Sequence, residues 1–199
     1  MSFRYEIRLS GEGGQGLVLA GKILAEAAAI YDNKNATQSQ SYGPEARGGA
    51  SRSEVIISDE DIDYPKAVHL DLLLAFTQEA CNKYWKDLKE DGILLVDSDA
   101  VTKIPEGKFK IYSVPILETA RSQIGKVVVA NIIALGIITE LAQVVSIEAM
   151  EAAILSRVPK GTEELNLRAF RLGLEMAKQF PGNCKIKMRE VTNGKTKIF

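Results

Sequence analysis

Two short segments of the sequence concentrate residue types that could hold an anionic group. The first, Gly11-Glu12-Gly13-Gly14-Gln15-Gly16, satisfies the G-x-G-x-x-G pattern. When such a loop joins a strand to a helix, its backbone N–H groups can bind a phosphate at the helix N-terminus. The amide of Gln15 adds a donor and an acceptor that a ligand or a neighbouring chain could use. The simplest interpretation of this motif is a dinucleotide site.

The second segment runs from Thr37 to Arg52 and is too polar to be core. It holds hydroxyl, amide, carboxylate and guanidinium groups and three glycines, and its candidate site residues are Ser41, Tyr42, Glu45, Arg47, Gly48 and Gly49. Such a stretch is either a solvated loop or a defined surface that meets something polar. Arg47, beside two glycines, could present a bidentate fork to a carboxylate or phosphate. The local alternative is a salt bridge from Arg47 to Glu45 or Glu54.

The dinucleotide interpretation lacks the acidic residue that its fingerprint requires. Asp32 falls in a polar turn directly after the first predicted helix, too early in the chain to meet a ribose hydroxyl at the end of a second strand. The glycines could equally serve tight packing of strand against helix and positive φ angles in the turn. Both interpretations of the loop stay open at the level of the sequence.

Other kinds of catalytic site find little support. His69 is the single histidine of the sequence and has no second histidine or cysteine pair nearby, which argues against a metal site and against a Ser-His-Asp triad. Gly125-Lys126 lacks the glycine spacing of a Walker A motif. Cys81 and Cys184 are far apart and in no ligand-like spacing, which indicates a reducing compartment.

The composition is typical of a soluble globular domain. The 199 residues are 46% hydrophobic and 26% charged, and the formal net charge of −1 provides no field that would attract a nucleic acid. The N-terminus has no apolar core of signal-peptide length, and the longest apolar run, 127–138, falls short of the ~20 residues that span a bilayer. We therefore expect a cytoplasmic chain with neither nucleic acid nor membrane as a partner.

Hydrophobic periodicity predicts alternating strands and helices around these segments. Apolar and β-branched runs predict strands at 7–10, 53–58, 71–76, 93–96 and 110–114. Helical spacing predicts a first helix with Leu17, Ala20, Leu24, Ala28 and Tyr31 on one face. A second helix is predicted with Ala80, Tyr84, Trp85 and Leu88 on one face. A helix over 126–143 is apolar almost all round, and Ser146 and Thr162 are predicted to cap two further helices.

This order of elements predicts an α/β fold. Parallel strands need crossover connections, and the crossover helices then cover both faces of the sheet. We therefore expect a three-layer sandwich with a largely parallel central sheet and a Rossmann-like glycine loop after the first strand. Residues 5–180 are predicted to form one domain, and 181–199 a basic C-terminal tail or hairpin.

Taken in order, these segments resemble one known family. The resemblance to the gamma-subunit family of 2-oxoacid:ferredoxin oxidoreductases is carried by Gly11 to Gly16 with Ala20-Gly21 and Leu24-Ala25, by Ser41-Tyr42-Gly43-Pro44-Glu45-Ala46-Arg47-Gly48-Gly49, and by Ser58 with Ile62-Asp63-Tyr64-Pro65. Gly92 to Asp97 and Asn131 with Leu135-Gly136 also fall where that family has similar residues. The loop at 41–49 looks more like the 2-oxoglutarate members than the pyruvate members.

The resemblance implies a complex that oxidatively decarboxylates a 2-oxoacid, expected to be 2-oxoglutarate, to its acyl-CoA and reduces ferredoxin. The family's complexes use thiamine diphosphate with Mg²⁺, iron–sulfur clusters and coenzyme A. This sequence has no Gly-Asp-Gly motif followed by an Asn, and its two cysteines cannot ligate a cluster that needs four. We therefore expect a chain that binds none of these cofactors alone and is inactive alone. Its expected partners are alpha and beta subunits, with or without a delta subunit, and ferredoxin through the hetero-oligomer.

Within such a complex, the 11–16 and 41–49 loops are expected to converge near the active site and to help handle coenzyme A. The first would offer backbone N–H groups and the second Arg47, and no residue of the chain is expected to be catalytic. Two alternatives stay open. One is a stand-alone nucleotide-binding domain, and the other is a purely structural assembly subunit whose loops contact only protein.

Overall fold

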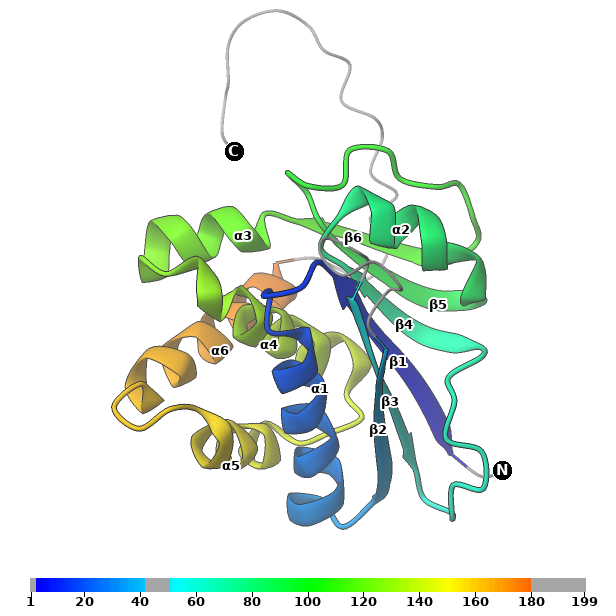
Figure 1. The fold of residues 1–199 in the computed structure, drawn as a ribbon, viewed down its shortest axis with the longest axis horizontal. Helices are drawn as coiled ribbons and strands as arrows, with labels where there is room; N and C mark the ends of the chain where they lie inside the picture. Colours follow the sequence, from blue (N-terminus) through cyan, green and yellow to red (C-terminus); the bar gives the residue numbers. More distant parts are fainter. Residues whose placement is uncertain (1–2, 42–50, 180–199) are drawn as a thin grey trace, which may run out of the picture.

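A six-stranded mixed sheet forms the centre of the molecule (Figure 1). The computed structural model describes residues 3–41 and 51–179. The strand order is β2-β3-β1-β4-β5-β6; β1, β4, β5 and β6 are parallel, whereas β3 is antiparallel to both β1 and β2. The strands are β1 (Arg4–Gly11), β2 (Asn35–Ser41), β3 (Ser51–Ser58), β4 (Leu70–Ala75), β5 (Leu88–Asp97) and β6 (Lys110–Val114).

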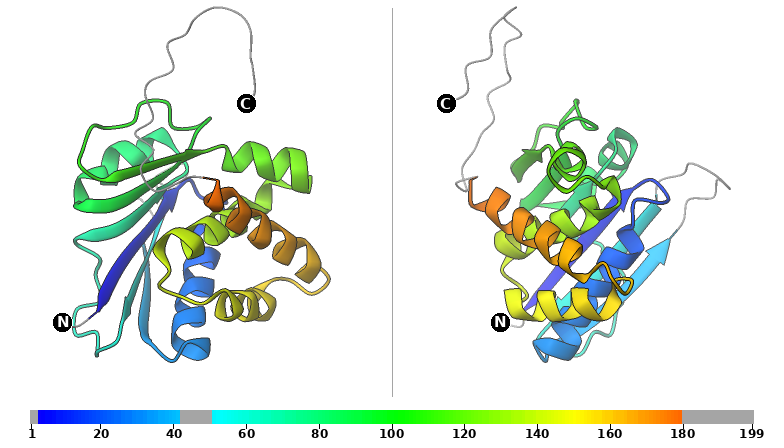
Figure 2. Two further views of the ribbon diagram at one scale, coloured as in Figure 1. Left: turned by 180° about the vertical axis from the view of Figure 1, so that it is seen from behind. Right: turned by 90° about the vertical axis from the view of Figure 1, so that its left-hand side faces the viewer.

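Helices flank the sheet unequally. One face carries α1 (Leu17–Glu26), α3 (Ile116–Thr119), α4 (Ala130–Ala142), α5 (Ile147–Arg157) and α6 (Glu163–Lys178), and the other carries α2 (Gln78–Tyr84) (Figure 2). Single turns of other helix types occupy Ala27–Tyr31, Trp85–Asp87, Ala120–Ile124 and Val127–Val129. The chain therefore has an α/β fold with a mixed, mostly parallel sheet. Within the described ranges, no helix is both long and apolar enough to cross a bilayer.

The central strands are apolar on both sides because both faces of the sheet are covered. In β4, Leu72 and Leu74 belong to the large core under α1 and α4, whereas Leu70 and Leu73 belong to the smaller core under α2. All four of these side chains are fully buried or nearly so. The short apolar runs that predicted strands in the sequence are the centres of β1, β3, β4, β5 and β6.

The apolar helix α4 is held against α6 at a crossing of two glycines. An added Cβ on Gly136 would lie 2.1 Å from the carbonyl oxygen of Phe170, and one on Gly173 would lie 2.1 Å from the carbonyl oxygen of Ile133. These backbone atoms cannot give way as a flexible side chain could. The two helix axes can therefore approach this closely only because both positions lack a side chain.

Two parts of the sequence behave differently from their prediction. Residues 37–41, the start of the segment interpreted as a solvated loop or a polar surface, lie in β2, an edge strand paired with β3 over seven residues. Leu88 was expected on the face of a helix, but the helix ends near Tyr84 and Leu88 opens β5. β2 shows no alternation of apolar and polar residues, because an edge strand faces little of the core. Leu88 fits the helical spacing of the residues before it only by chance, because it is the apolar first residue of β5.

The two predicted helix caps also differ from each other. The side chain of Ser146 accepts a hydrogen bond from the backbone N–H of Ala149, as an N-cap residue does. Thr162 occupies the N-cap position of α6 but its side chain caps no backbone N–H. Its hydroxyl instead donates to the carbonyl of Pro159 and accepts from the amide of Asn166. The predicted C-terminal tail, 181–199, lies outside the described residues.

Candidate functional site

The glycine loop, residues 12–16, lies at the carboxyl edge of the parallel strands. β1 ends at Gly11 and passes to α1 on one face of the sheet, whereas the neighbouring parallel strand β4 passes to α2 on the other face. In open α/β sheets, this reversal of direction leaves a crevice in which ligands commonly bind. The fold thus puts the first candidate segment where a parallel sheet usually has its site.

Hydrogen bonds fix the glycine loop from both ends. The side-chain Oε1 of Gln15 accepts from the backbone N–H of Glu12 at 2.7 Å. The acceptor of the Gln15 amide therefore stabilises the loop itself. At the other end, the buried amide of Asn131 at the start of α4 donates to the carbonyl of Gly16 at 3.0 Å. The Asn131 contact was not predicted, although a polar residue inside an apolar helix was the visible signal.

Three of the four glycines between positions 11 and 16 are explained by this chain's own structure. An added Cβ on Gly11 would lie 2.2 Å from Oε1 of Gln15, and one on Gly16 would lie 2.5 Å from Nδ2 of Asn131. Gly14 has a φ of +90°, which favours glycine. Gly13 has neither a positive φ nor any atom within 4 Å of an added Cβ. Nothing in the described part of the chain requires a glycine at position 13.

The second candidate segment begins beside the first. Ser41 ends β2 and pairs with Arg52 of β3, and Arg52 in turn pairs with Ser10 of β1. Ser51, the first residue of β3, pairs with Gly11. Ser41 and Ser51, the described residues on either side of 42–50, therefore lie at the carboxyl edge, next to the glycine loop. The other predicted residues of this segment, Tyr42, Glu45, Arg47, Gly48 and Gly49, lie outside the described residues.

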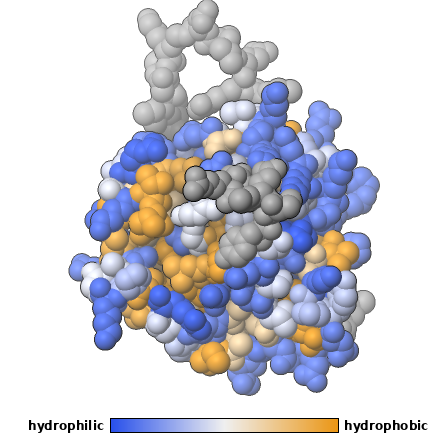
Figure 3. Space-filling view, viewed as in Figure 1, coloured by the Kyte–Doolittle hydropathy of each residue, from blue (hydrophilic) through white to orange (hydrophobic). Residues whose placement is uncertain are grey.

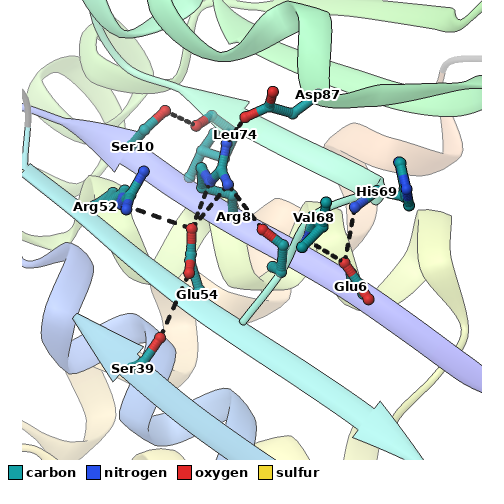
Figure 4. Close-up of polar contacts among 11 residues, drawn as sticks. Glu6, Arg8, Ser10, Ser39, Arg52, Glu54, Val68, His69, Leu74 and Asp87 are labelled. Atoms are coloured by element: carbon teal, nitrogen blue, oxygen red, sulfur yellow. Dashed lines mark hydrogen bonds and ion pairs between the residues drawn. The ribbon is translucent and has the colours of Figure 1, made fainter. Parts of the chain in front are cut away.

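A buried cluster of charges lies under α2, on the face of the sheet opposite α1 (Figure 4). Arg8 of β1 has a side chain only 4% exposed, and its Nε donates to Oε1 of Glu54 at 2.8 Å. Arg8 also pairs with Asp87 and donates to the carbonyl of Ala67. Arg52 lies 3.6 Å from Glu54. Arg8, a charged residue inside a predicted strand, is the signal in the sequence that indicates this cluster.

Residues that other types of chemistry would need are engaged elsewhere. The carboxylate of Asp32 accepts from the backbone N–H and the hydroxyl of Ser146, both at 2.6 Å, at the start of α5 and at the far end of α1 from the glycine loop. Burial raises the pKa of the Cys81 thiol to about 11, which keeps it unreactive at neutral pH. Within the described ranges no His, Cys, Asp and Glu side chains gather as a metal site would require.

An open hollow of about 590 Å³ lies near that far end, lined by Asp32, Lys34, Thr139, Glu140, Gln143, Val145, Ser146, Ile147 and Glu148. Four of its polar side chains, those of Asp32, Lys34, Thr139 and Ser146, already take part in fold contacts. Nζ of Lys34 donates to the carbonyl of Val144 at 2.6 Å, and Thr139 donates to the carbonyl of Leu135. This hollow is therefore a weaker candidate than the carboxyl edge.

Exposed apolar side chains lie in the turn before α4, the helix whose Asn131 holds the glycine loop. Val127 and Val128 are 40% and 68% exposed and lie in the turn that precedes Asn131. Apolar residues gather over the helical side of the molecule in the space-filling view (Figure 3). The candidate site thus combines fixed backbone, hydroxyl groups, a guanidinium group and apolar side chains at one edge of the sheet.

Comparison with known proteins supplies the context for this edge. The sequence matches the model of the family described as pyruvate ferredoxin/flavodoxin oxidoreductase over residues 6–176. It is 56% identical over 181 residues to the 2-oxoglutarate synthase subunit KorC of Methanocaldococcus jannaschii, covering 90% of this chain and 97% of the relative. Identity to the pyruvate synthase subunit PorC of Methanothermobacter marburgensis is 31% over 176 residues, covering 87% and 97% of the two chains.

Solved structures show the same fold. The gamma subunit of a keto/oxoacid ferredoxin oxidoreductase from Geobacter sulfurreducens superimposes with a TM-score of 0.83 at 59% identity, covering 89% of this chain and 98% of that one. A 2-oxoglutarate:ferredoxin oxidoreductase from Magnetococcus marinus, with 2-oxoglutarate, coenzyme A and succinyl-CoA bound, gives a TM-score of 0.79 at 24% identity. The match covers 90% of this chain and 32% of that one, and at this identity it concerns the fold alone.

Proposed function

Because the chain belongs to the pyruvate ferredoxin/flavodoxin oxidoreductase family, we propose that it acts as the gamma subunit of a 2-oxoglutarate:ferredoxin oxidoreductase. High identity along nearly the full length of a 2-oxoglutarate synthase subunit carries this proposal. The lower identity to pyruvate synthase subunits favours 2-oxoglutarate over pyruvate. The complex converts 2-oxoglutarate and coenzyme A to succinyl-CoA and CO₂, and the two electrons released reduce two ferredoxins.

The chain's part in this reaction is to complete a site that other subunits carry. Thiamine diphosphate supplies the decarboxylation chemistry in such a complex. Two cysteines in the whole sequence are too few for a cluster that needs four, so the electron-transfer groups belong to the partner chains. We place the contribution of this subunit at the carboxyl edge, where its fixed loop and its polar strand ends face the partners.

Gly13 is the observation that supports a role for this edge beyond folding. A glycine that the described part of the chain does not need is explained if something beyond that part approaches the backbone closely. A coenzyme phosphate fits such a backbone, because N–H groups at the start of a helix favour anions. Val127 and Val128 in the turn before α4 offer apolar area to a partner subunit. The loop therefore faces coenzyme A across the contact with the catalytic subunits.

The position of Asp32 in the structure also disfavours the stand-alone nucleotide-binding alternative. Asp32, the nearest acidic side chain after the first helix, is hydrogen-bonded to Ser146 at the opposite end of α1. A dinucleotide at the glycine loop would have no carboxylate from this position for its ribose.

The direct test is to co-purify the tagged chain from its native host without oxygen and to identify the proteins that elute with it. The eluate is then assayed for coenzyme A-dependent reduction of a viologen dye with 2-oxoglutarate, pyruvate and a branched 2-oxoacid. We expect partners with a thiamine motif and cysteine clusters, and turnover that is highest with 2-oxoglutarate. Elution of the chain alone and without activity would contradict the proposal, whereas equal or higher turnover with pyruvate would contradict only its substrate.

A further inference from the structure

Two arginines of the buried cluster are used very differently. The guanidinium of Arg8 is fully engaged in contacts within the fold. It donates to Glu54 and to the carbonyl of Ala67 and pairs with Asp87, and its side chain is 4% exposed. Arg52 has a side chain 35% exposed and, within the described residues, donates no hydrogen bond. Its nearest acceptor there is Glu54 at 3.6 Å, beyond good hydrogen-bond length for N–H to O. Within residues 3–41 and 51–179, the donors of the Arg52 guanidinium therefore have no hydrogen-bond partner.

The Arg52 guanidinium is nevertheless held in place. Residues two apart on a strand share a face, so Arg52 and Glu54 both point toward α2. There the guanidinium of Arg52 lies 5.6 Å from the ring centroid of Tyr84, within the range of a cation–π contact. Glu54 is itself held in place, because Arg8 donates to the same Oε1 that lies nearest Arg52, and the hydroxyl of Ser39 lies 3.5 Å from Oε2 (Figure 4). A fixed guanidinium with spare donors loses little conformational entropy when it binds an anion.

The charge around Tyr84 leaves room for one more anion. Arg8, Arg52 and Lys83 all lie within 5.6 Å of the ring centroid. Among the described residues, Glu54 and Asp87 pair with Arg8 and Arg52, and the exposed Lys83 is left as one positive charge in excess. In a partly buried region such an excess attracts an anion more strongly than it would in open solvent.

Arg52 also lies at the edge where the proposed function needs an anion contact. It pairs with Ser41 on one side and with Ser10 on the other, one residue from the start of β3. Arg4 offers a useful contrast: its side chain is 34% exposed and pairs with a glutamate at 2.8 Å, but it lies at the opposite end of the sheet and also donates to the carbonyl of Tyr64. The two side chains are thus equally exposed, but the guanidinium of Arg4 donates hydrogen bonds whereas that of Arg52 donates none within the described residues.

We propose that Arg52 is a substrate-binding residue of the oxidoreductase, whose guanidinium contacts an anionic oxygen group, either a phosphate of coenzyme A or a carboxylate of the 2-oxoacid. Glu54 and Tyr84 are the positioning residues that hold it. This inference rests on the proposed function for the identity of the ligand. The contact itself follows from the geometry of Arg52.

Steady-state kinetics of the assembled complex test the proposal. Arg52→Gln should raise the KM for one of the two substrates by about 10- to 100-fold, since hydrogen bonds to charged groups contribute about 1.5–3 kcal/mol. Arg52→Lys should recover only part of the loss, because a point charge cannot replace a fork. The control Arg4→Gln removes an equally exposed arginine and should leave both KM values within about twofold of the parent.

The substrate whose KM changes identifies the anion. If it is coenzyme A, the 3′-dephospho form serves as a second substrate: a contact with that phosphate predicts that Arg52→Gln has little further effect on the KM for the dephospho form. A change confined to 2-oxoglutarate assigns a carboxylate instead. Unchanged KM values for both substrates in Arg52→Gln, whatever happens to the yield of complex, would overturn the proposal.

A second measurement does not depend on turnover. Inorganic pyrophosphate added to the purified full chain should raise its Tm, since a ligand bound only to the folded state stabilises it. The rise should be lost in Arg52→Gln and kept in Arg4→Gln. If the complex proves inactive but this pattern holds, the proposed function fails and the anion site stands. If all three chains respond alike, the Arg52 site fails.

Discussion

At the scale of single residues, the glycine loop separates what the fold requires from what it does not. Gly11 and Gly16 are required because side chains of Gln15 and Asn131 occupy the space beside them. Gly14 is required by its positive φ. The sequence pattern predicted the loop but could not rank its glycines, because that ranking depends on contacts with α4, more than a hundred residues away. Arg52 was missed as a site residue for the same reason, since its ring partner lies on α2.

Gly13→Ala should leave the fold intact and disturb function. The added methyl meets nothing in the described part of the chain, so the free energy of unfolding should stay equal or rise by up to about 1 kcal/mol through a less flexible unfolded chain. Turnover of the complex with coenzyme A should fall at least several-fold, because the methyl intrudes on what approaches the loop. Urea unfolding of the chain and viologen reduction by the complex measure the two effects. Parent-like turnover would remove the argument from Gly13.

Gly14 and Gly161 form a matched pair for the same question. Their φ angles are +90° and +85°, and an added Cβ meets nothing within 4 Å at either position. Alanine at each should therefore cost a similar amount of stability, about 1–2 kcal/mol for a side chain in the left-handed region. Thermal unfolding should show similar losses, whereas only Gly14→Ala should lower turnover per assembled complex. An equal loss of turnover in both would show that strain alone, and no contact at the loop, is responsible.

Cys81 gives the chain a predictable response to alkali. Burial raises the thiol pKa from 9.0 to about 11 in the folded chain, so the unfolded chain loses this proton first as the pH rises. The contribution to stability is complete below pH 9, falls between pH 9 and 11 by up to about 1.4 kcal/mol per pH unit, and is lost above. In Cys81→Ala, the free energy of unfolding measured across this window should fall less steeply. An identical slope would contradict the assignment.

At the scale of elements, the sequence predicted helices and strands best where burial decides them. The 126–143 helix was readable because α4 is covered on nearly every side. β2 was not readable, because its Asn, Thr, Gln and Ser side chains give no apolar alternation, and its strand character comes from pairing with β3. The hydrophobic pattern also could not predict that β3 pairs antiparallel to β1, because the direction of a strand depends on the path of the connection before it.

The crossing of α4 and α6 sets the strongest single-residue requirement on the fold. Gly173→Ala places a methyl 2.1 Å from the carbonyl oxygen of Ile133, so the two helices must move apart. We expect a loss of about 3 kcal/mol or more, at the upper end of overpacking effects. Gly13→Ala serves as the control in thermal and urea unfolding, because the same change there meets open space. A loss below about 1 kcal/mol would show that the crossing is looser than described.

At the scale of the whole molecule, the candidate site lies at one end of the sheet, whereas contacts that stabilise the fold lie at the other. The carboxyl edge gathers the glycine loop, Ser41 and Arg52, whereas contacts at the far end of α1, such as Asp32 with Ser146, tie the helices together. The sequence predicted the α/β class and the position of the glycine loop, because both follow from local order. The buried charge cluster could not be predicted, since β1, β3 and the turn after α2 meet only in the folded chain.

Asp32→Ala tests this division of tasks. It removes two hydrogen bonds of 2.6 Å at the start of α5 and should lower the free energy of unfolding by about 1–3 kcal/mol. Turnover per assembled complex should stay unchanged, since the site lies at the other end of the molecule. A fall in turnover with unchanged stability would reverse the assignment of the two ends.

The bonds from Gln15 to Glu12 and from Asn131 to Gly16 have a consequence for how fast the subunit joins its complex. They fix the glycine loop during folding, before any partner arrives, so association does not wait for the loop to find its shape. Encounter and orientation of two preformed surfaces then set the association rate, on the order of 10⁵–10⁷ M⁻¹s⁻¹ for proteins. Loosening either bond would slow association even where the final complex is the same.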